Sequence, residues 1–504
     1  MLKKIDSWLN NHTMYRVVLY GLVGLALLSI LFAFLNLLPF SGWQLLSLLL
    51  LCAVSSWLAH RFLEKIFHPA SGLESGHITG LIFFFILAPI SKPIDVPITL
   101  AVVFFGAASK YLLAIEKKHL FNPVAIALVV MGLFGYGNAI WWVGSSLLLP
   151  FVSLLGLAVL RKLRRFDLFI AFTMASLLMV VWNNRQTSLT ILETIWQVLG
   201  SWPLVFMGSI MLTEPLTGPV RRRFYWFYGV VVGLFFGSRF QLGPIHSTPE
   251  LALIIGNLLA YFLTKPVKLE LSLQAKRKIG QDLYEFDFIP RGKFQFLAGQ
   301  YLEWTLKNKV ADERGNRRFF TIASAPSEKV LSLAIKVAHP SSSFKQQLMA
   351  LKEGEKISAS QLSGDFVLPK DRQQALVFIA GGIGITPFRS MIKHLIDLQE
   401  KREIKLFYIC TQKEEFAYQE LFRQAENIGL QTIYVLSKKA QIPKDWTGEI
   451  GYLNEEMLKK YLGSANNYAF YLSGPNSMVE SYAKLLQKMG VKKKKIITDY
   501  FPGF

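Results

Sequence analysis

Ten apolar runs occupy most of the first 265 residues, and this feature limits the fold more than any other. A helix needs about 20 apolar residues to cross a bilayer, and the first run is long enough to span and lacks a small-residue cleavage site. Basic residues gather in alternate loops between the runs. Because basic loops stay on the cytoplasmic side, this alternation predicts ten spans with both chain ends in the cytoplasm. The runs lie near residues 15–38, 43–60, 77–89, 94–115, 121–137, 139–160, 166–182, 200–213, 224–243 and 249–264.

Charge divides the chain into two parts. Residues 1–265 hold 19 Lys+Arg and 9 Asp+Glu, whereas residues 266–504 have the composition of an ordinary soluble protein. The net charge of +21 is shared between both parts, and membrane loops need basic residues, so nucleic-acid binding is not expected. Cys52 and Cys410 are the only cysteines, which excludes a four-thiolate iron–sulfur site and a disulfide framework. No metal site is expected.

Two of the predicted spans are unusually short. His77–Pro89 and Ser201–Thr213 have about 13 residues each, and each is the third span of a five-span half. An odd number of spans per half makes the halves inverted repeats. Short broken segments at matching places in such repeats indicate a central binding site.

Several motifs in the apolar part resemble one membrane-protein family. They are SGHITGLIFFFILAP at 75–89, SKYLLA at 109–114, KHLFNPVAIAL at 118–128 and MLTEPLTGP at 211–219. These motifs are similar, in the same order, to the B subunit of the sodium-pumping NADH:quinone oxidoreductase and the D subunit of the Rnf complex. The resemblance implies ten helices in inverted repeats and electron transfer through the bilayer, often by flavin.

The same resemblance implies a cofactor site between the repeats, formed by Thr79, Asn122, Thr213 and Glu214. Relatives carry covalent FMN on a Ser/Thr-Gly-Ala-Thr stretch, which is missing here, so FMN or riboflavin held noncovalently is the cofactor expected. Polar groups in a membrane segment cost free energy when they lack hydrogen-bond partners, so such residues often belong to a functional site. The alternative is that these residues only cap helices at the interface.

Beyond residue 265 the pattern changes to that of a soluble protein. Short alternating strands at 269–275, 283–288 and 331–337 predict an antiparallel β-barrel. From residue 375, buried strands alternate with helices, which predicts an α/β domain with a parallel sheet. The expected helices follow the glycine-rich turn, up to Leu395, and cover Ala417–Asn427. We therefore expect a multi-domain chain with a transmembrane domain at 1–265, an FAD-binding barrel at 266–370 and an NAD(P)-binding domain at 371–504.

Three motifs in this second part occur in a fixed order. They are RRFFTIAS at 317–324, GGIGITP at 381–387 and YLSGP at 471–475. A glycine turn at a helix start lets backbone N–H groups approach a pyrophosphate. The ordered set resembles the ferredoxin–NADP reductase superfamily over nearly all of residues 266–504.

That resemblance implies an FAD site and an NAD(P)H site. Arg318 binds a flavin phosphate, Phe319 and Phe320 line the flavin, and Thr321 contacts it near N5, where hydride arrives. Ser342 and Ser343 open a helix at the FAD pyrophosphate. Ser473 stands where many members have a cysteine beside the nicotinamide, and Phe504 matches a terminal aromatic that covers the flavin. The residues implied in nucleotide binding are Gly381, Gly382, Gly384, Thr386, Pro387, Gly474 and Pro475.

The combined expectation is a membrane-bound NAD(P)H dehydrogenase, integral to a bacterial cytoplasmic membrane. Electrons pass from cytoplasmic NAD(P)H through FAD and the helices to a quinone or an extracytoplasmic flavoprotein. One alternative is an ion transporter or channel with a redox-sensing flavin domain. Another is a haem-containing ferric reductase or NADPH oxidase, although no two spans each carry two histidines. After the strand that ends at Cys410, Lys413 favours the 2′-phosphate of NADPH, whereas the acidic Glu414 and Glu415 disfavour it, so the sequence leaves the choice between NADH and NADPH open.

Overall fold

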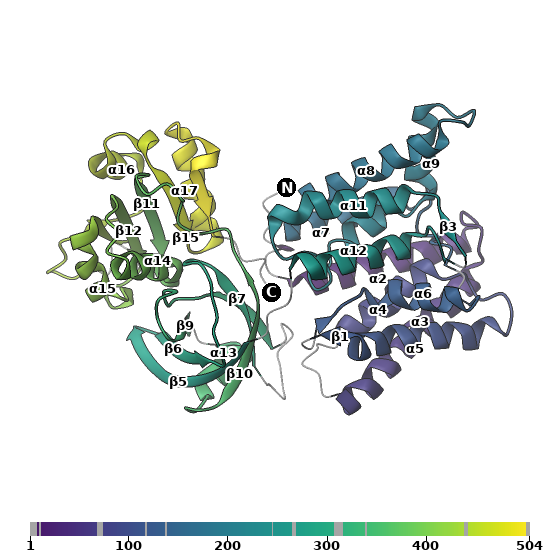
Figure 1. Cartoon of the computed structure of the whole chain (residues 1–504), viewed down its shortest axis with the longest axis horizontal. Coiled ribbons are helices and arrows are strands. Elements are labelled where there is room, and N and C mark those ends of the chain that lie inside the picture. Colours follow the sequence, from purple (N-terminus) through teal and green to yellow (C-terminus); the bar gives the residue numbers. More distant parts are fainter. Residues whose placement is uncertain are drawn as a thin grey trace. The chain divides into compact units, whose positions relative to one another are not determined.

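A computed structural model gives the fold. The structure describes residues 8–9, 12–67, 74–115, 118–136, 139–243, 245–264, 269–306, 316–337, 340–437 and 442–499. The chain divides into two compact units, Met1–Pro266 and Val267–Phe501 (Figure 1). The first is helical and the second contains two large sheets, so each is described by itself.

Apolar helices build the first unit, and each predicted span contains helical residues. Their order in the chain follows the order of the apolar runs. The helices are α2 (Met14–Phe34), α3 (Gly42–Phe67), α4 (Glu74–Ile86), α5 (Asp95–Leu112), α6 (Pro123–Leu133), α7 (Leu149–Leu163), α8 (Phe166–Asn184), α9 (Ile191–Ser201), α10 (Leu204–Phe206), the π-helix η1 (Met207–Met211), α11 (Tyr225–Gly237) and α12 (Pro249–Leu263).

Fewer helices are long enough to span than the ten that the sequence predicts. In the described part of the chain, α2, α3, α5 and α8 are long and apolar enough to cross a membrane, and a bent pair makes a fifth. The helices α4, α6 and α12 are apolar but shorter. The structure therefore confirms several apolar helices in this unit, whereas ten complete crossings stay a prediction.

The two short third segments differ in form. The first is the continuous 13-residue helix α4. The second belongs to a broken helix, because α9 and the segment Leu204–Met211 meet at an angle of 67°. Pro203 lies at this break, where a ring without an N–H interrupts the helical ladder. The π-helix η1 follows, a distortion that often accompanies functional sites.

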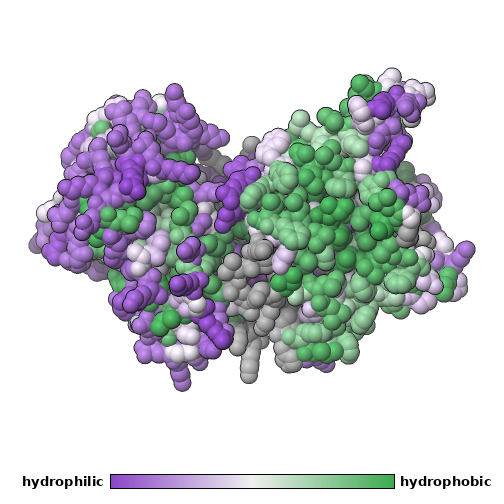
Figure 2. All heavy atoms as spheres, viewed as in Figure 1, coloured by the Kyte–Doolittle hydropathy of each residue, from purple (hydrophilic) through white to green (hydrophobic). Residues whose placement is uncertain are grey.

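Large apolar side chains cover the outside of the helical unit. Leu154 is 66% exposed, Leu178 is 68% exposed and Phe262 is 68% exposed. Figure 2 shows the same apolar surface spread over these helices, whereas the second unit is mainly polar. An apolar patch of this size would be unusual for a soluble monomer and is typical of a surface in contact with lipid.

Close helix packing in this unit depends on glycine. Gly229, Gly233 and Gly237 lie four residues apart on α11 and face the backbone of α8. A Cβ atom on Gly233 would lie 2.5 Å from the Phe172 carbonyl oxygen. Small residues at four-residue spacing let two apolar helices approach closely, which is how helices associate when lipid surrounds them.

We expect Gly233→Ala to destabilise the helical unit by roughly 1–3 kcal/mol, because the added methyl overpacks the interface. The measurement is the thermal unfolding midpoint of the purified protein in detergent. Gly24→Ala is the matched control, since a Cβ on this helical glycine meets nothing within 4 Å. Alanine also favours a helix over glycine, so the control should unfold at or above the wild-type temperature. Equal midpoints for both variants would contradict this account of the packing.

The second unit begins with a curled antiparallel sheet. Its order is β8-β7-β10-β5-β6-β9. The Ala323 N–H donates to the Ser332 carbonyl oxygen at 2.8 Å, which brings the chain after β8 beside β9. Its core is built around the buried Trp304, Phe286 and Phe288. The strands are β5 (Leu269–Gly280), β6 (Leu283–Pro290), β7 (Tyr301–Thr305), β8 (Arg317–Thr321), β9 (Leu331–Lys336) and β10 (Lys356–Ser363).

A parallel sheet follows, with order β14-β13-β12-β11-β15-β16. Its central strands are apolar on both faces because helices cover each face. The predicted helix Ala417–Asn427 is shorter than expected, with α15 covering Gln419–Gln424 and a 3₁₀ turn after it. The main elements are β11 (Leu376–Gly381), α14 (Thr386–Asp397), β12 (Ile404–Cys410), β13 (Leu430–Leu436), β14 (Glu449–Ile450), α16 (Glu455–Leu462), β15 (Ala469–Ser473), α17 (Asn476–Lys488) and β16 (Ile496–Thr498).

Candidate functional site

Strand β8 presents a buried cation to the start of a helix. Side chains alternate along a strand, so Arg318 and Phe320 share one face. The Arg318 guanidinium lies 5.4 Å from the Phe344 ring centre, and the Phe320 ring lies 5.8 Å from the same ring. Phe344 belongs to the first turn of α13 (Ser343–Ala350). The strand with the predicted flavin residues and the helix start at Ser342 and Ser343 therefore meet here.

The helix start at α13 is well formed. Ser342 is its N-cap, and the Ser342 hydroxyl accepts a hydrogen bond from the Lys345 N–H at 3.4 Å. Ser343 is the first helical residue, and the N–H groups of a first turn point out of the helix. These N–H groups and the helix dipole favour an anion at this end.

The residues present fit the diphosphate of FAD. The Ser341 hydroxyl oxygen is buried without a hydrogen-bond partner among the described residues. Arg318 supplies a positive charge at the same helix start. A buried polar atom without a partner is costly, and a bound phosphate oxygen would satisfy it.

The rest of β8 is arranged around the edge of the sheet. Thr321 is buried and pairs with Tyr301 of β7, and the Phe319 ring makes an edge contact with Tyr301. The Trp304 indole N–H donates to the Phe320 carbonyl oxygen at 3.1 Å. Phe319 and Phe320 therefore lie on opposite faces of the strand, so they cannot line one flavin ring in the same way.

The glycine motif forms a tight turn between β11 and α14. Gly381 ends the strand, and the next four residues form the 3₁₀ turn η3 (Gly382–Ile385). Gly382 has φ +53°, and a Cβ there would meet nothing within 4 Å, so its backbone is open to a ligand. A Cβ on Gly384 would lie 2.5 Å from the Ser473 carbonyl oxygen. Only glycine allows this close approach.

Thr386 and Pro387 begin α14, where proline suits the first turn because its missing N–H has no helical partner. Ser473 ends β15, beside Ala380 of β11 in the parallel register. Its buried hydroxyl donates to the Asp499 carboxylate at 3.0 Å. Gly474 has φ +152° and lies against Gly381, and Pro475 caps α17. Phe504 lies outside the described residues.

The charged residues after β12 are already engaged. The Glu415 carboxylate accepts hydrogen bonds from the Lys336 ammonium at 2.8 Å and the Thr411 hydroxyl at 2.9 Å. Burial favours the neutral acid, but these contacts outweigh it and hold the pKa of Glu415 below its ordinary value. Lys413 pairs with Asp445 at 2.5 Å. Two of the three charged residues expected to influence the choice between NADH and NADPH, Lys413 and Glu415, are therefore paired with other groups of the protein.

In the helical unit, Glu214 joins the two predicted repeats. The Asn122 side-chain amide donates to the Glu214 carboxylate at 3.1 Å, and the Thr217 hydroxyl donates to it at 3.2 Å. The His119 ring nitrogen lies 3.3 Å from the same carboxylate. The Asn257 side-chain oxygen accepts from the Asn122 N–H at 2.8 Å, which adds α12 to the group. We call Asn122, Glu214, His119, Thr217 and Asn257 the Glu214 cluster.

A pocket that is partly open to solvent adjoins this cluster. Small-molecule sites combine apolar walls with a few polar groups. Polar and apolar side chains share its wall, as such sites require. The lining residues are Ile115, His119, Leu120, Leu216, Thr217, Gly218, Asn257, Ala260, Tyr261 and Thr264.

Thr79 and Thr213 do not join the Glu214 cluster. The Lys110 ammonium donates to the Thr79 hydroxyl at 2.7 Å and to the Ser75 hydroxyl at 2.9 Å, and it lies 3.3 Å from a His60 ring nitrogen. The Thr213 hydroxyl donates to the Ser209 carbonyl oxygen of its own segment at 2.6 Å. The four predicted residues are therefore divided between separate polar contacts.

Several residues at these sites were not singled out from the sequence. His119 and Lys110 lie inside the quoted motifs, and a charge within an apolar run is a signal that could have found Lys110. Asn257 is a lone amide in an apolar helix, which is a similar signal. Arg389 of α14 donates to the Ala323 carbonyl oxygen of the loop after β8, and it gave no such signal because charged residues are common on soluble helices.

Comparison with known proteins agrees with this geometry. The family described as "Oxidoreductase NAD-binding domain" matches residues 378–484. The F subunit of the Na(+)-translocating NADH-quinone reductase from Haemophilus influenzae (strain PittEE) is 30% identical over 218 residues, covering 40% of this chain and 52% of the relative. Its counterpart in Serratia proteamaculans is 31% identical over 201 residues, covering 37% and 49%. The chain spans about half the length of these curated relatives.

One of the solved structures to which this chain is similar is the Amycolatopsis cytochrome P450 reductase GcoB. It has a TM-score of 0.42 and 23% identity, covering 47% of this chain and 70% of the other. The cytochrome b5 reductase domain of Ulva prolifera nitrate reductase has a TM-score of 0.41 and 20% identity, covering 46% and 97%.

The fold and the family match define the class of one part of the C-terminal unit: residues 378–484 match an oxidoreductase NAD-binding domain. Among curated proteins, this part is similar to the F subunit of the Na(+)-translocating NADH-quinone reductase. The similarity that the apolar motifs suggest, to the B subunit, stays a prediction.

Proposed function

We propose that the chain is a membrane-bound NAD(P)H dehydrogenase with three domains, at 1–265, 266–370 and 371–504. Electrons enter from NAD(P)H at the second unit, pass into the helical unit and leave to a quinone or an extracytoplasmic acceptor. A bacterial cytoplasmic membrane, with the nucleotide site on the cytoplasmic side, suits the alternation of basic loops. The relatives' name, which describes part of an NADH-quinone reductase, supports the donor and a quinone acceptor.

One observation carries the proposal. The loop that follows the flavin strand and the helix that follows the glycine turn bond to each other within one compact unit. An FAD on Arg318 and a nucleotide on the glycine turn would therefore lie on neighbouring elements. FAD, when bound, accepts two electrons together as a hydride and releases them one at a time.

The chain's own residues serve binding and orientation. Arg318 and the start of α13 would hold the FAD diphosphate, and Thr321, at the end of the same strand, would contact the flavin. Gly382 would open the backbone to the nucleotide pyrophosphate, and Ser473, which lies next to Gly384, would contact the nicotinamide. The hydrogen bond to Asp499 fixes the direction in which the Ser473 hydroxyl donates.

A second cofactor in the helical unit completes the route. We propose noncovalent FMN or riboflavin at the pocket beside the Glu214 cluster. The pocket offers the Thr217 hydroxyl, the Asn257 amide and the His119 ring as polar contacts, with Tyr261 as an aromatic wall. A flavin ring needs both kinds of contact.

The test uses the full-length protein in liposomes that contain a quinone. We expect NAD(P)H oxidation with an artificial acceptor and quinone reduction at a matching rate, both without an imposed ion gradient. Oxidation that never reaches quinone would contradict the membrane route. Failure to oxidise either nucleotide would contradict the proposal as a whole.

One observation favours a second candidate, an ion transporter with a redox-sensing flavin domain. The broken helix formed by α9 and the segment Leu204–Met211 resembles the discontinuous helices at transport sites. The discriminating measurement is uptake of sodium ions or protons into the same liposomes. Ion movement without quinone reduction would favour the transporter.

A further inference from the structure

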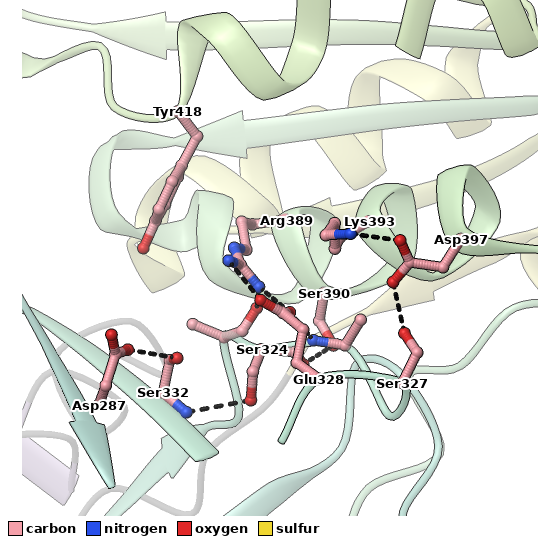
Figure 3. Close-up of polar contacts among 12 residues, drawn as sticks. Asp287, Ser324, Ser327, Glu328, Ser332, Arg389, Ser390, Lys393, Asp397 and Tyr418 are labelled. Atoms are coloured by element: carbon pink, nitrogen blue, oxygen red, sulfur yellow. Dashed lines mark hydrogen bonds and ion pairs between the residues drawn. The ribbon is translucent and has the colours of Figure 1, made fainter. Parts of the chain in front are cut away.

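Arg389 joins the flavin side of the second unit to the nucleotide side. It lies in the first turns of α14, and its guanidinium forms a two-pronged ion pair with Glu328, with one N···O distance of 3.0 Å (Figure 3). The same guanidinium donates to the Ala323 carbonyl oxygen at 3.1 Å. The Arg389 side chain is 11% exposed and that of Glu328 is 21% exposed, so water screens the pair little.

The neighbouring residue makes a second connection. The Ser390 hydroxyl donates to the Ser324 carbonyl oxygen at 2.6 Å, and both residues are fully buried. The Ser324 hydroxyl accepts from the Ser332 N–H at 3.0 Å, and the Ser332 hydroxyl donates to the Asp287 carboxylate at 2.6 Å. These contacts run from α14 through the loop at 323–328 into β9 and β6 (Figure 3). We call that loop the link loop.

The link loop is also held by its own contacts. The Glu328 carboxylate that binds Arg389 accepts from the Ala325 N–H at 2.5 Å. The residue before Glu328 contacts the other end of α14, where the Ser327 hydroxyl donates to the Asp397 carboxylate at 2.5 Å. One carboxylate therefore shapes the loop and binds the helix together. Without the Arg389 contacts, the loop would be attached to α14 through Ser390 and Asp397.

The position of these contacts in the chain gives them a specific consequence. Ala323 follows Thr321, at the end of the flavin strand, by two residues. Arg389 follows Pro387, at the end of the glycine motif, by two residues. Any shift between the link loop and α14 therefore changes the separation of the two predicted binding sites. A displacement of about 1 Å between reacting groups can cost about 100-fold in rate.

The chemistry of the pair favours a role in positioning over one in stability. Replacing a buried ion pair with apolar residues is often neutral or stabilising, because removing two charges from water is costly. Burial opposes the charge on the guanidinium, but pairing with Glu328 outweighs this and raises the pKa of Arg389. The fork of a guanidinium also fixes direction, which a lysine ammonium does not.

We propose that Arg389, supported by Ser390, is a positioning residue that holds the flavin-binding strand β8 at a set distance from the nucleotide-binding turn and so controls hydride transfer. This inference rests on the proposed function. Arg389 itself contacts the link loop and acts on the reacting groups through that loop.

The test compares full-length Arg389→Met and Arg389→Lys with wild type. We expect the methionine variant to lower kcat for NAD(P)H oxidation by on the order of 100-fold with a much smaller change in KM, since binding residues stay in place. The lysine variant should recover part of the loss because it keeps the charge without the fork. FAD content should equal that of wild type for both. Glu328→Gln should reproduce the methionine variant's effect.

The matched control is Lys393→Met, one turn further along α14. Lys393 pairs with Asp397 at the edge of the same interface, and its loss leaves the Ser327 contact to Asp397 in place. A readout independent of turnover is hydrogen–deuterium exchange over residues 322–330. We expect faster exchange there in Arg389→Met and wild-type exchange in the control.

The outcomes separate the two proposals. If wild type oxidises NAD(P)H but Arg389→Met matches it in kcat and in exchange, the positioning role is wrong. If Lys393→Met reduces kcat as strongly, the effect belongs to general packing and the proposal is overturned. If wild type oxidises no nucleotide, the proposed function fails, and the exchange rates still decide whether Arg389 holds the link loop.

Discussion

Full-length protein carrying Arg318→Ala is expected to purify with little or no FAD. Its guanidinium is the buried cation at the start of α13, where the flavin diphosphate would lie. A hydrogen bond to a charged group contributes about 1.5–3 kcal/mol, so its loss should weaken FAD binding by roughly 10- to 100-fold. The measurement is the amount of FAD per chain that denaturation releases after gel filtration, separated from FMN and riboflavin by chromatography, followed by titration with FAD.

Arg317→Ala is the matched control for this experiment. Arg317 precedes Arg318 on the same strand but faces the other side, where its guanidinium lies 3.9 Å from the Glu303 carboxylate. Both variants remove one positive charge, so only the side of the strand differs. Equal flavin loss from both would place the phosphate contact elsewhere, and full flavin occupancy in Arg318→Ala would show that this assignment is wrong.

Glu214→Ala is expected to abolish electron delivery to quinone while NAD(P)H oxidation with ferricyanide continues. The carboxylate holds Asn122, His119 and Thr217 together beside the pocket, so its removal leaves three polar groups without their shared partner. Unmatched polar groups in a membrane segment are costly, and the pocket should lose its shape. We expect a loss of more than 10-fold in quinone reduction, on the order of one broken charged hydrogen bond.

Flavin content provides the second measurement for Glu214→Ala. Denatured wild-type protein should release all of its flavin, at more than one flavin per chain, and the variant should lose the flavin of the helical unit. Glu193→Gln is the control, because this exposed carboxylate caps α9 through Thr190 and lies outside the cluster. A single flavin per chain in wild type, unaffected by Glu214→Ala, would remove the proposed membrane cofactor and favour the transporter.

The sequence predicted the second unit well because its signals are local. Alternation along RRFFT is enough to place Arg318 and Phe320 on one face, and glycine at 381–384 is enough to predict a turn before a helix. The predicted strands at 269–275, 283–288 and 331–337 differ from β5, β6 and β9 only at their ends. A pattern with a period of two residues needs no knowledge of distant contacts.

The helical unit was predicted less completely. Apolar runs reveal which segments avoid water, but they do not reveal where a helix ends inside the apolar region. Pro203 separates the segment that holds η1 from α9, which lies mostly outside the predicted run at 200–213, and the angle between them depends on what packs around the break. The number of complete crossings is therefore a property of packing, which hydropathy alone does not give.

By itself, the sequence determined the division into an apolar helical part and a soluble nucleotide-binding part, since composition and short-range periodicity are enough for both. Only the tertiary structure decided which polar groups meet. Asn122 and Glu214 are 92 residues apart and form one hydrogen bond, whereas Thr79 binds Lys110 and Thr213 turns back to its own segment. Arg389 and Glu328 are 61 residues apart. Such pairs form because tertiary packing brings residues that are far apart in the sequence to within hydrogen-bond distance, about 3 Å. A local sequence pattern does not predict which distant residues will meet.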